Sequence, residues 1–241
     1  MKIFGLTHIG NVRELNEDYI VFNSFPDGAV YAAVCDGMGG ANAGEVASET
    51  AAKRFEENIL KNYSAEYNSS NIRNLLNASV NIANYAVFDK AQVNKGYSGM
   101  GTTLVSVIVK ETEAVIVNVG DSRAYKIGDE IKKITIDHSF VQDLVNKGEI
   151  TEADAENHPD KNIITRALGA EERVTADFYF ETLEEGETLL LCSDGLSGLV
   201  KEEDMRTLSK IADIEKAAEA LIDNALLMGG NDNISVILIR N

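Results

Sequence analysis

Cysteine, proline and tryptophan are scarce in this sequence. It has two cysteines, two prolines and no tryptophan in 241 residues. Two cysteines without zinc-ligand spacing argue against a disulfide framework and against a structural zinc site. Cys35 and Cys192 lie within apolar runs, where we expect small buried thiols. Because no proline-rich or serine/glycine-rich linker divides the chain, the sequence predicts a single domain over residues 1–241.

Long apolar runs and an excess of basic residues are also absent. No run of about 18 apolar residues occurs, so we expect no transmembrane helix and no membrane partner. The first residues become polar too soon for a secretory signal, which favours a cytoplasmic protein. The 22 basic and 39 acidic residues give a formal charge of −17, which disfavours binding to nucleic acid.

The chain does contain many short β-branched runs and several amphipathic stretches. Apolar stripes of helical period predict long helices at 44–61, 71–92 and 214–228, with shorter ones between 139 and 157. Strands are expected at 3–8, 18–23, 30–35, 176–181, 187–192 and 233–240, and four runs between 102 and 136 suggest one antiparallel meander. Because strands and helices are grouped rather than alternating, the pattern favours an α+β fold, with two antiparallel sheets packed face to face and helices outside.

Aspartates occur repeatedly where an apolar strand ends or begins. In the stretch AVCDGMGG a strand runs directly into Asp36, and Gly37 follows. A turn alone explains one such aspartate, since Asp bonds to nearby backbone and Gly accepts positive φ. The alternative is that a metal ion or a phosphate comes close to the backbone here. Five aspartates share this kind of position: Asp18, Asp36, Asp121, Asp194 and Asp232.

If these strand ends converge, the carboxylates repel one another unless a cation or protons neutralise them. Clusters of oxygen ligands suit the hard cations Mg²⁺ and Mn²⁺, and the Gly37 carbonyl is a further candidate ligand. Two such ions about 4 Å apart convert a shared water into a hydroxide near neutral pH. With Arg13 to bind an anion, the natural reaction is hydrolysis of a phosphate ester. The alternative for Arg13 is a surface ion pair with Glu14 or Glu17.

Eight blocks of the sequence resemble the metal-dependent protein phosphatases of type 2C, and specifically the compact bacterial serine/threonine phosphatases. They occur in that family's order and span nearly the whole chain: GLTHIGNVRELNEDYI, VCDGMGGANAGEVAS, GMGTTLVSVIV, VNVGDSRAYKI, DHSF, HPDKNIITRALG, LLLCSDGLSGLV and GGNDNISVILI. The resemblance implies a central β-sandwich with helices on both faces (α-β-β-α). It also implies a mobile flap at about residues 139–164.

The resemblance implies a role for each site residue. Asp36 would bridge two Mn²⁺ or Mg²⁺ ions, and a hydroxide between them would attack phosphorus. The catalytic residues would be Arg13, Asp36, Asp194 and Asp232, with Arg13 orienting the phosphoryl group. Asp194 and Asp232 would complete the shell of one ion, while the Gly37 carbonyl and, through water, Asp18 would hold the other, supported by Glu17. A third ion, seen in bacterial members, would lie at Asp121 and Asp194.

The implied activity is dephosphorylation of phosphoserine and phosphothreonine in proteins, opposing a serine/threonine kinase, by a monomer. Two other functions stay open at this stage. A non-catalytic protein could bind phosphoproteins without hydrolysing them, or a divalent cation could serve only to stabilise the fold.

One departure from the family concerns the general acid. Many relatives have a histidine within or just after the DGMGG block, where this chain has Met38 and Ala41. His158 is the nearest other candidate in the sequence, although a structural role is the more common one for such a residue. We expect His138 to make a turn or surface contact and assign no role to His8.

Overall fold

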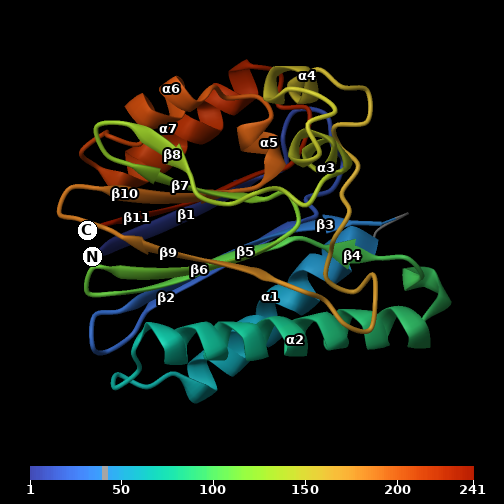
Figure 1. The fold of residues 1–241 in the computed structure, drawn as a ribbon, viewed down its shortest axis with the longest axis horizontal. Coiled ribbons are helices and arrows are strands. Elements are labelled where there is room, and N and C mark those ends of the chain that lie inside the picture. Colours follow the sequence, from blue (N-terminus) through green and yellow to red (C-terminus); the bar gives the residue numbers. More distant parts are fainter. Residues whose placement is uncertain (40–42) are drawn as a thin grey trace.

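The computed structural model describes residues 1–39 and 43–241, so Ala41 lies outside the described residues. Two sheets lie back to back in the middle of the molecule, and helices cover both outer faces (Figure 1). The described residues contain no helix that is long and apolar enough to cross a membrane. Both termini lie at one end of the sandwich, and α3 and α4 lie at the opposite end (Figure 1).

The first sheet has five strands in the order β1-β11-β10-β7-β8. All its pairings are antiparallel. The N- and C-terminal strands are neighbours in it, which joins the two ends of the chain. Its strands are β1 (Lys2–His8), β7 (Arg123–Ile127), β8 (Ile131–Lys133), β10 (Thr188–Cys192) and β11 (Ile234–Arg240).

The second sheet is also antiparallel, in the order β2-β3-β5-β6-β9, with the short β4 paired to the end of β3. Its strands are β2 (Asp18–Ser24), β3 (Val30–Met38), β4 (Gly101–Thr102), β5 (Leu104–Lys110), β6 (Glu113–Val119) and β9 (Asp177–Thr182). The predicted α+β class with two packed antiparallel sheets is therefore confirmed.

Helices pack on the two outer faces. Two long helices, α1 (Ala43–Asn62) and α2 (Ser69–Val93), cover the second sheet. The first sheet is covered by α6 (Glu202–Leu208) and α7 (Ile214–Leu227), and the short α5 (Asp194–Ser197) follows β10 directly. Neither α5 nor α6 is predicted from the sequence, because each spans at most seven residues and shows too little periodicity.

Strand alternation explains how the sandwich is filled. In β3, Tyr31, Ala33 and Cys35 face α1 and α2, whereas Val30, Ala32 and Val34 face the first sheet. All six are fully buried. Successive side chains of a strand point to opposite faces, so a continuous apolar run is the pattern expected of a strand covered on both sides. The two cysteines are buried free thiols, as the sequence predicts.

The predicted single meander over residues 102–136 is wrong, because the chain changes sheets after β6. β6 belongs to the second sheet and β7 to the first. The crossing occurs at Gly120, whose φ of +108° suits glycine. A Cβ there would also lie 2.6 Å from the Thr103 side chain. This crossing places Asp121 between the two sheets.

The segment 139–164 contains α3 (Phe140–Asn146) and α4 (Glu152–Glu156), and an isolated bridge between Ser139 and Ile164 closes it. Thr151 and Asp154 form a full capping box, although aspartate is short for this role.

Candidate active site

Strand pairing brings the five aspartates to one end of the sandwich. Asp18 begins β2 and lies directly opposite Asp36, near the end of β3. In the other sheet, Asp194 lies two residues after the end of β10, and Asp232 lies two residues before β11, which is antiparallel to β10. Asp121 precedes β7, whose first residue pairs with the last residue of β10. Antiparallel neighbours start and end at the same edge, so residues far apart in sequence meet here.

A pocket of about 260 Å³ opens between these strand ends. Seven of the eight predicted site residues line it, and Asp18 is almost fully buried. The lining residues are Arg13, Glu17, Asp36, Gly37, Met38, Gly39, Thr103, Asp121, Asn162, Ile164, Asp194, Asp232 and Asn233.

The backbone around Asp36 is held from several sides. The Asp36 N–H donates to Thr103 Oγ1 at 3.0 Å, and the Thr103 N–H donates to the Asp36 carbonyl at 2.8 Å. The Gly37 N–H donates to the Glu17 carbonyl at 3.0 Å. A side chain at position 37 would overlap the Gly44 carbonyl oxygen. Glycine is therefore required because helix α1 begins directly against this turn, which is the structural reason for the unusual DG sequence.

Asp18 links the two sheets beneath the pocket. Its Oδ2 accepts a hydrogen bond of 2.8 Å from the Ser193 hydroxyl, and Ser193 Oγ accepts the N–H of Ser235. Among the described residues, its other carboxylate oxygen, Oδ1, is buried and has no hydrogen-bond partner. The same is true of Oδ1 of Asp194. A buried carboxylate oxygen without a partner destabilises the folded state. A bound cation would supply the missing partner for both of these oxygens.

Burial and mutual repulsion raise the pKa values of the aspartates. Burial first, and then the charges of Asp18 and Asp194, hold the pKa of Asp36 well above its usual range. Burial raises the pKa of Asp18 and of Asp121 to about 7, with the Asp194 charge contributing to both. The pKa of Asp194 is raised by burial and by Asp232. The cluster thus favours species that neutralise negative charge: protons or cations.

The donor set fits a hard divalent cation. Within residues 1–39 and 43–241, no three His, Cys, Asp or Glu side chains form a metal-binding group by themselves. A cation would therefore use backbone carbonyl oxygen and water as well as carboxylates. That mixture is the one Mg²⁺ favours, since it keeps several waters of its octahedral shell. The unpartnered oxygens and the raised pKa values also agree with such an ion.

Arg13 makes an ion pair, but with a different partner from the predicted glutamates. Its guanidinium donates to Asp232 Oδ2 at 2.7 Å, and both side chains are partly exposed. This hydrogen bond is the main reason that the pKa of Arg13 is raised. Arg13 therefore lies at the mouth of the pocket, where its remaining N–H groups can reach an anion.

Asn233 is an important residue that sequence reasoning missed. Its Oδ1 accepts the Glu17 N–H at 2.8 Å, and its Nδ2 donates to the carbonyls of Ile9 and Leu15 at 2.9 Å each. One amide thus fixes three backbone groups of the loop that carries Arg13. The only signal in the sequence is the adjacency of Asn233 to Asp232, and it does not reveal these distant partners.

No histidine is among the described residues that line the pocket. His158 lies in the 139–164 segment, where its ring is 6.1 Å from that of Phe140 and its Nδ1 accepts the Asp160 N–H. The prediction of a turn or surface contact for His138 is wrong, because the residue is buried. Its Nδ1 accepts the Gly120 N–H, and its Nε2 bonds to Asp177, so it braces the turn before Asp121.

Comparisons with known proteins agree with this geometry. Residues 4–226 match the model of the family "Protein phosphatase 2C". The chain is 39% identical over 236 residues to the "Serine/threonine phosphatase stp" of Listeria innocua, covering 97% of this chain and 93% of that protein.

Solved structures are similar over the same length. The Stp1 serine/threonine phosphatase of Staphylococcus aureus superposes with a TM-score of 0.93 at 36% identity, covering 100% of this chain and 94% of that one. The catalytic domain of the phosphatase PstP, in complex with two manganese ions, superposes with a TM-score of 0.85 at 32% identity, covering 98% and 96%. On the match of the family model, the identity to these relatives and the shared fold, the chain belongs to the protein phosphatase 2C family of serine/threonine phosphatases.

Proposed function

We propose that this chain hydrolyses phosphoserine and phosphothreonine in other proteins, using Mn²⁺ or Mg²⁺ bound at the end of the sandwich. The observation that carries the proposal is the meeting of carboxylates from both sheets in one pocket that also holds Arg13. Carboxylates alone would repel a phosphate. Cations among them, together with a guanidinium, make the pocket attractive to a phosphate dianion.

The proposed ligands follow the family's pattern. Asp36 would be the carboxylate shared by two ions, Asp194 and Asp232 would bind one of them, and the Gly37 carbonyl would bind the other. Asp18 would hold the second ion through water, supported by Glu17, and Asp121 with Asp194 would hold a third. When bound, divalent cations supply Lewis acidity and lower the pKa of water, which furnishes the nucleophile. The pairing of Asp18 with Asp36 across β2 and β3, and the presence of Gly37 among the residues that line the pocket, support this assignment.

The chain's own residues perform the remaining tasks. The Arg13 guanidinium binds oxygens of the phosphoryl group and stabilises the charge that develops on them. Asn233 and Thr103 hold the backbone of Arg13's loop and of Asp36 in place. With no imidazole among the described residues that line the pocket, the departing serine or threonine oxygen takes its proton from water.

We also propose that residues 1–241 form one catalytic domain with a flap at about 139–164. Asn162 and Ile164, at the end of that segment, line the pocket, which supports a role in covering the substrate. The protein acts in the cytoplasm as a monomer and opposes a serine/threonine kinase. The two buried free thiols agree with a reducing compartment.

Hydrolysis of a phosphothreonine peptide, with Mn²⁺ and with excess EDTA, tests the proposed function. We expect release of phosphate with Mn²⁺ and none above background with EDTA, because the nucleophile depends on the cation. Binding of the peptide without phosphate release would instead indicate a non-catalytic phosphoprotein binder. A cation that changes only the melting temperature would indicate a structural ion.

Arg13→Ala is expected to raise KM for a phosphopeptide about tenfold, while Mn²⁺ affinity changes little. The reason is that a charge-assisted contact to phosphate contributes about 1.5–3 kcal/mol, and part of it is offset by water in an open pocket. Steady-state kinetics and calorimetric titration with Mn²⁺ measure the two effects. Kinetics equal to those of the wild type would restrict Arg13 to its ion pair with Asp232.

A further inference from the structure

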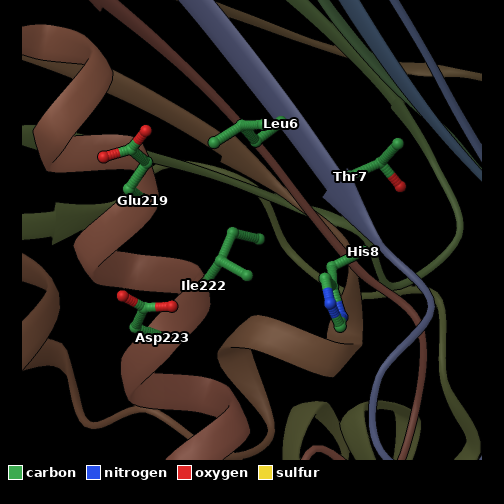
Figure 2. A pocket seen from close by; sticks show the side chains of 6 residues that line it. All are labelled: Leu6, Thr7, His8, Glu219, Ile222 and Asp223. Carbon is green, nitrogen blue, oxygen red and sulfur yellow. The ribbon is translucent and has the colours of Figure 1, made fainter.

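A second pocket, of about 240 Å³, lies between α7 and β1 and takes no part in the proposed chemistry (Figure 2). It is lined by Leu6, Thr7 and His8 of β1 and by Glu219, Ile222 and Asp223 of α7. Figure 2 shows Leu6 and Ile222 in the space between strand and helix, while the two carboxylates project from the helix beside them. The pocket thus combines an apolar floor with an acidic rim.

Among the described residues, no basic side chain forms an ion pair with the carboxylates of the acidic rim. Glu219 and Asp223 are four residues apart, so they lie on the same face of α7. Both are exposed, and the ion pairs of residues 1–39 and 43–241 all involve other side chains. Two like charges at this spacing repel each other, so a cation between them is favoured. On the strand side, His8 Nδ1 accepts the Gly10 N–H, which leaves Nε2–H as a donor.

We propose that this pocket binds a lysine or arginine side chain of the phosphorylated protein substrate. The aliphatic stem of such a residue packs on Leu6 and Ile222, and its charged end reaches Glu219 and Asp223. A neutral or acidic side chain would leave the two carboxylates unpaired. The proposal rests on the proposed function and adds a preference for substrates with a basic residue near the phosphorylated one.

The pocket is connected to the active site through both of its walls. β1 ends at His8, and only five positions separate His8 from Arg13. The loop after α7 leads to Asp232. Since an extended chain covers at most about 3.6 Å per residue, the Cα atoms of His8 and Arg13 are no more than about 18 Å apart. An extended substrate therefore spans the two sites with about five residues.

Hydrogen bonds from Asn11 connect the loop after β1 to the loop after α7. The Asn11 N–H donates to the Gly230 carbonyl at 2.7 Å, and Asn11 Nδ2 donates to the carbonyls of Leu226 and Gly229. These bonds join the two loops that border the path. Next to them, Val12 is 64% exposed and Leu227 84% exposed. These two exposed side chains offer apolar contact to a substrate that lies between the two sites.

Phosphothreonine peptides that differ only in lysine or glutamine at one position test this inference. The position is varied from three to seven residues on either side of the phosphothreonine. At one spacing we expect kcat/KM to be about five- to tenfold higher with lysine, as two partly exposed ion pairs allow. The advantage should disappear in the double variant Glu219→Gln/Asp223→Asn. Hydrolysis of p-nitrophenyl phosphate, which cannot reach the pocket, should be unchanged.

The matched control is Glu66→Gln/Glu185→Gln, which removes two exposed charges from the α1–α2 and β9–β10 loops, outside the lining of this pocket. It should keep the full preference for lysine. The inference is overturned if no spacing favours lysine, if the preference survives in Glu219→Gln/Asp223→Asn, or if both double variants reduce it equally. Failure of the wild type to hydrolyse p-nitrophenyl phosphate with Mn²⁺ would overturn the proposed function instead, so the two failures are distinguishable.

Discussion

An Asp36→Asn variant is expected to lose phosphatase activity by a factor on the order of a thousand or more, measured as kcat with Mn²⁺ and a phosphothreonine peptide. Burial first, and then the charges of the four other aspartates of the cluster, raise the pKa of Asp36. An amide of the same shape keeps the backbone bonds to Thr103 but lacks the negative charge that the proposed role of Asp36 as a shared ligand of two cations would require.

The same substitution should leave the fold intact and stabilise it in the absence of metal. Removing one charge from a buried cluster of like charges relieves repulsion, so we expect a higher melting temperature in EDTA than for the wild type. Asp89→Asn, at an exposed position of α2, is the matched control and should change neither quantity. An Asp36→Asn variant with most of its activity would contradict the proposed role of the cluster. If Asp36→Asn melted at a lower temperature than the wild type in EDTA, the Asp36 carboxylate would stabilise the metal-free fold through other contacts.

The positions of the five aspartates were predictable because each lies at the end of an apolar run. A strand that is buried on both faces must place a charged residue at or beyond its end, and antiparallel pairing gathers such ends. Asp18 and Asp36 need only the β2–β3 hairpin to meet. The positions of these aspartates depend on local sequence, so the sequence pattern alone is enough to predict them.

Contacts between the two sheets could not be predicted in the same way. The change of sheet at Gly120, the hydrogen bond from Ser193 to Asp18 and the ion pair from Arg13 to Asp232 all depend on how the sheets stack. Sequence separations of 175 and 219 residues divide the last two pairs. Serine and asparagine near a strand end are also common in simple turns, so Ser193 and Asn233 carry no distinctive signal.

The wrong prediction for His138 has the same cause, namely contacts with segments that are distant in the sequence. DHS looks like a polar turn, but the bonds of His138 to Gly120 and Asp177 come from segments 18 and 39 residues away. Burial lowers the pKa of this histidine despite its carboxylate neighbour. The neutral imidazole connects the turn at Gly120 to Asp177 of β9 through hydrogen bonds. The periodicity of a single segment does not predict contacts of this kind.

In EDTA, the melting temperature of the protein is expected to fall as the pH rises from about 5 to about 8. The pKa of Asp18 and of Asp121 is about 7 in the folded protein, whereas aspartate in an unfolded chain titrates near 3.9. Between these values the folded state binds more protons than the unfolded state, so the free energy of unfolding decreases as the pH increases. For a chain of this size, a loss of a few kcal/mol corresponds to roughly 5–10 °C.

His138 acts in the opposite direction, because its lowered pKa makes the folded state bind fewer protons than the unfolded state just below pH 6.5. The carboxylate contribution is therefore measured as the difference between the wild type and Asp18→Asn/Asp121→Asn, which should have a flatter profile. Excess Mn²⁺ should raise the wild-type melting temperature more at pH 8 than at pH 5, since cations compete with protons for the same oxygens. Profiles of equal slope for the wild type and the double variant would mean that these carboxylates are not buried together in solution.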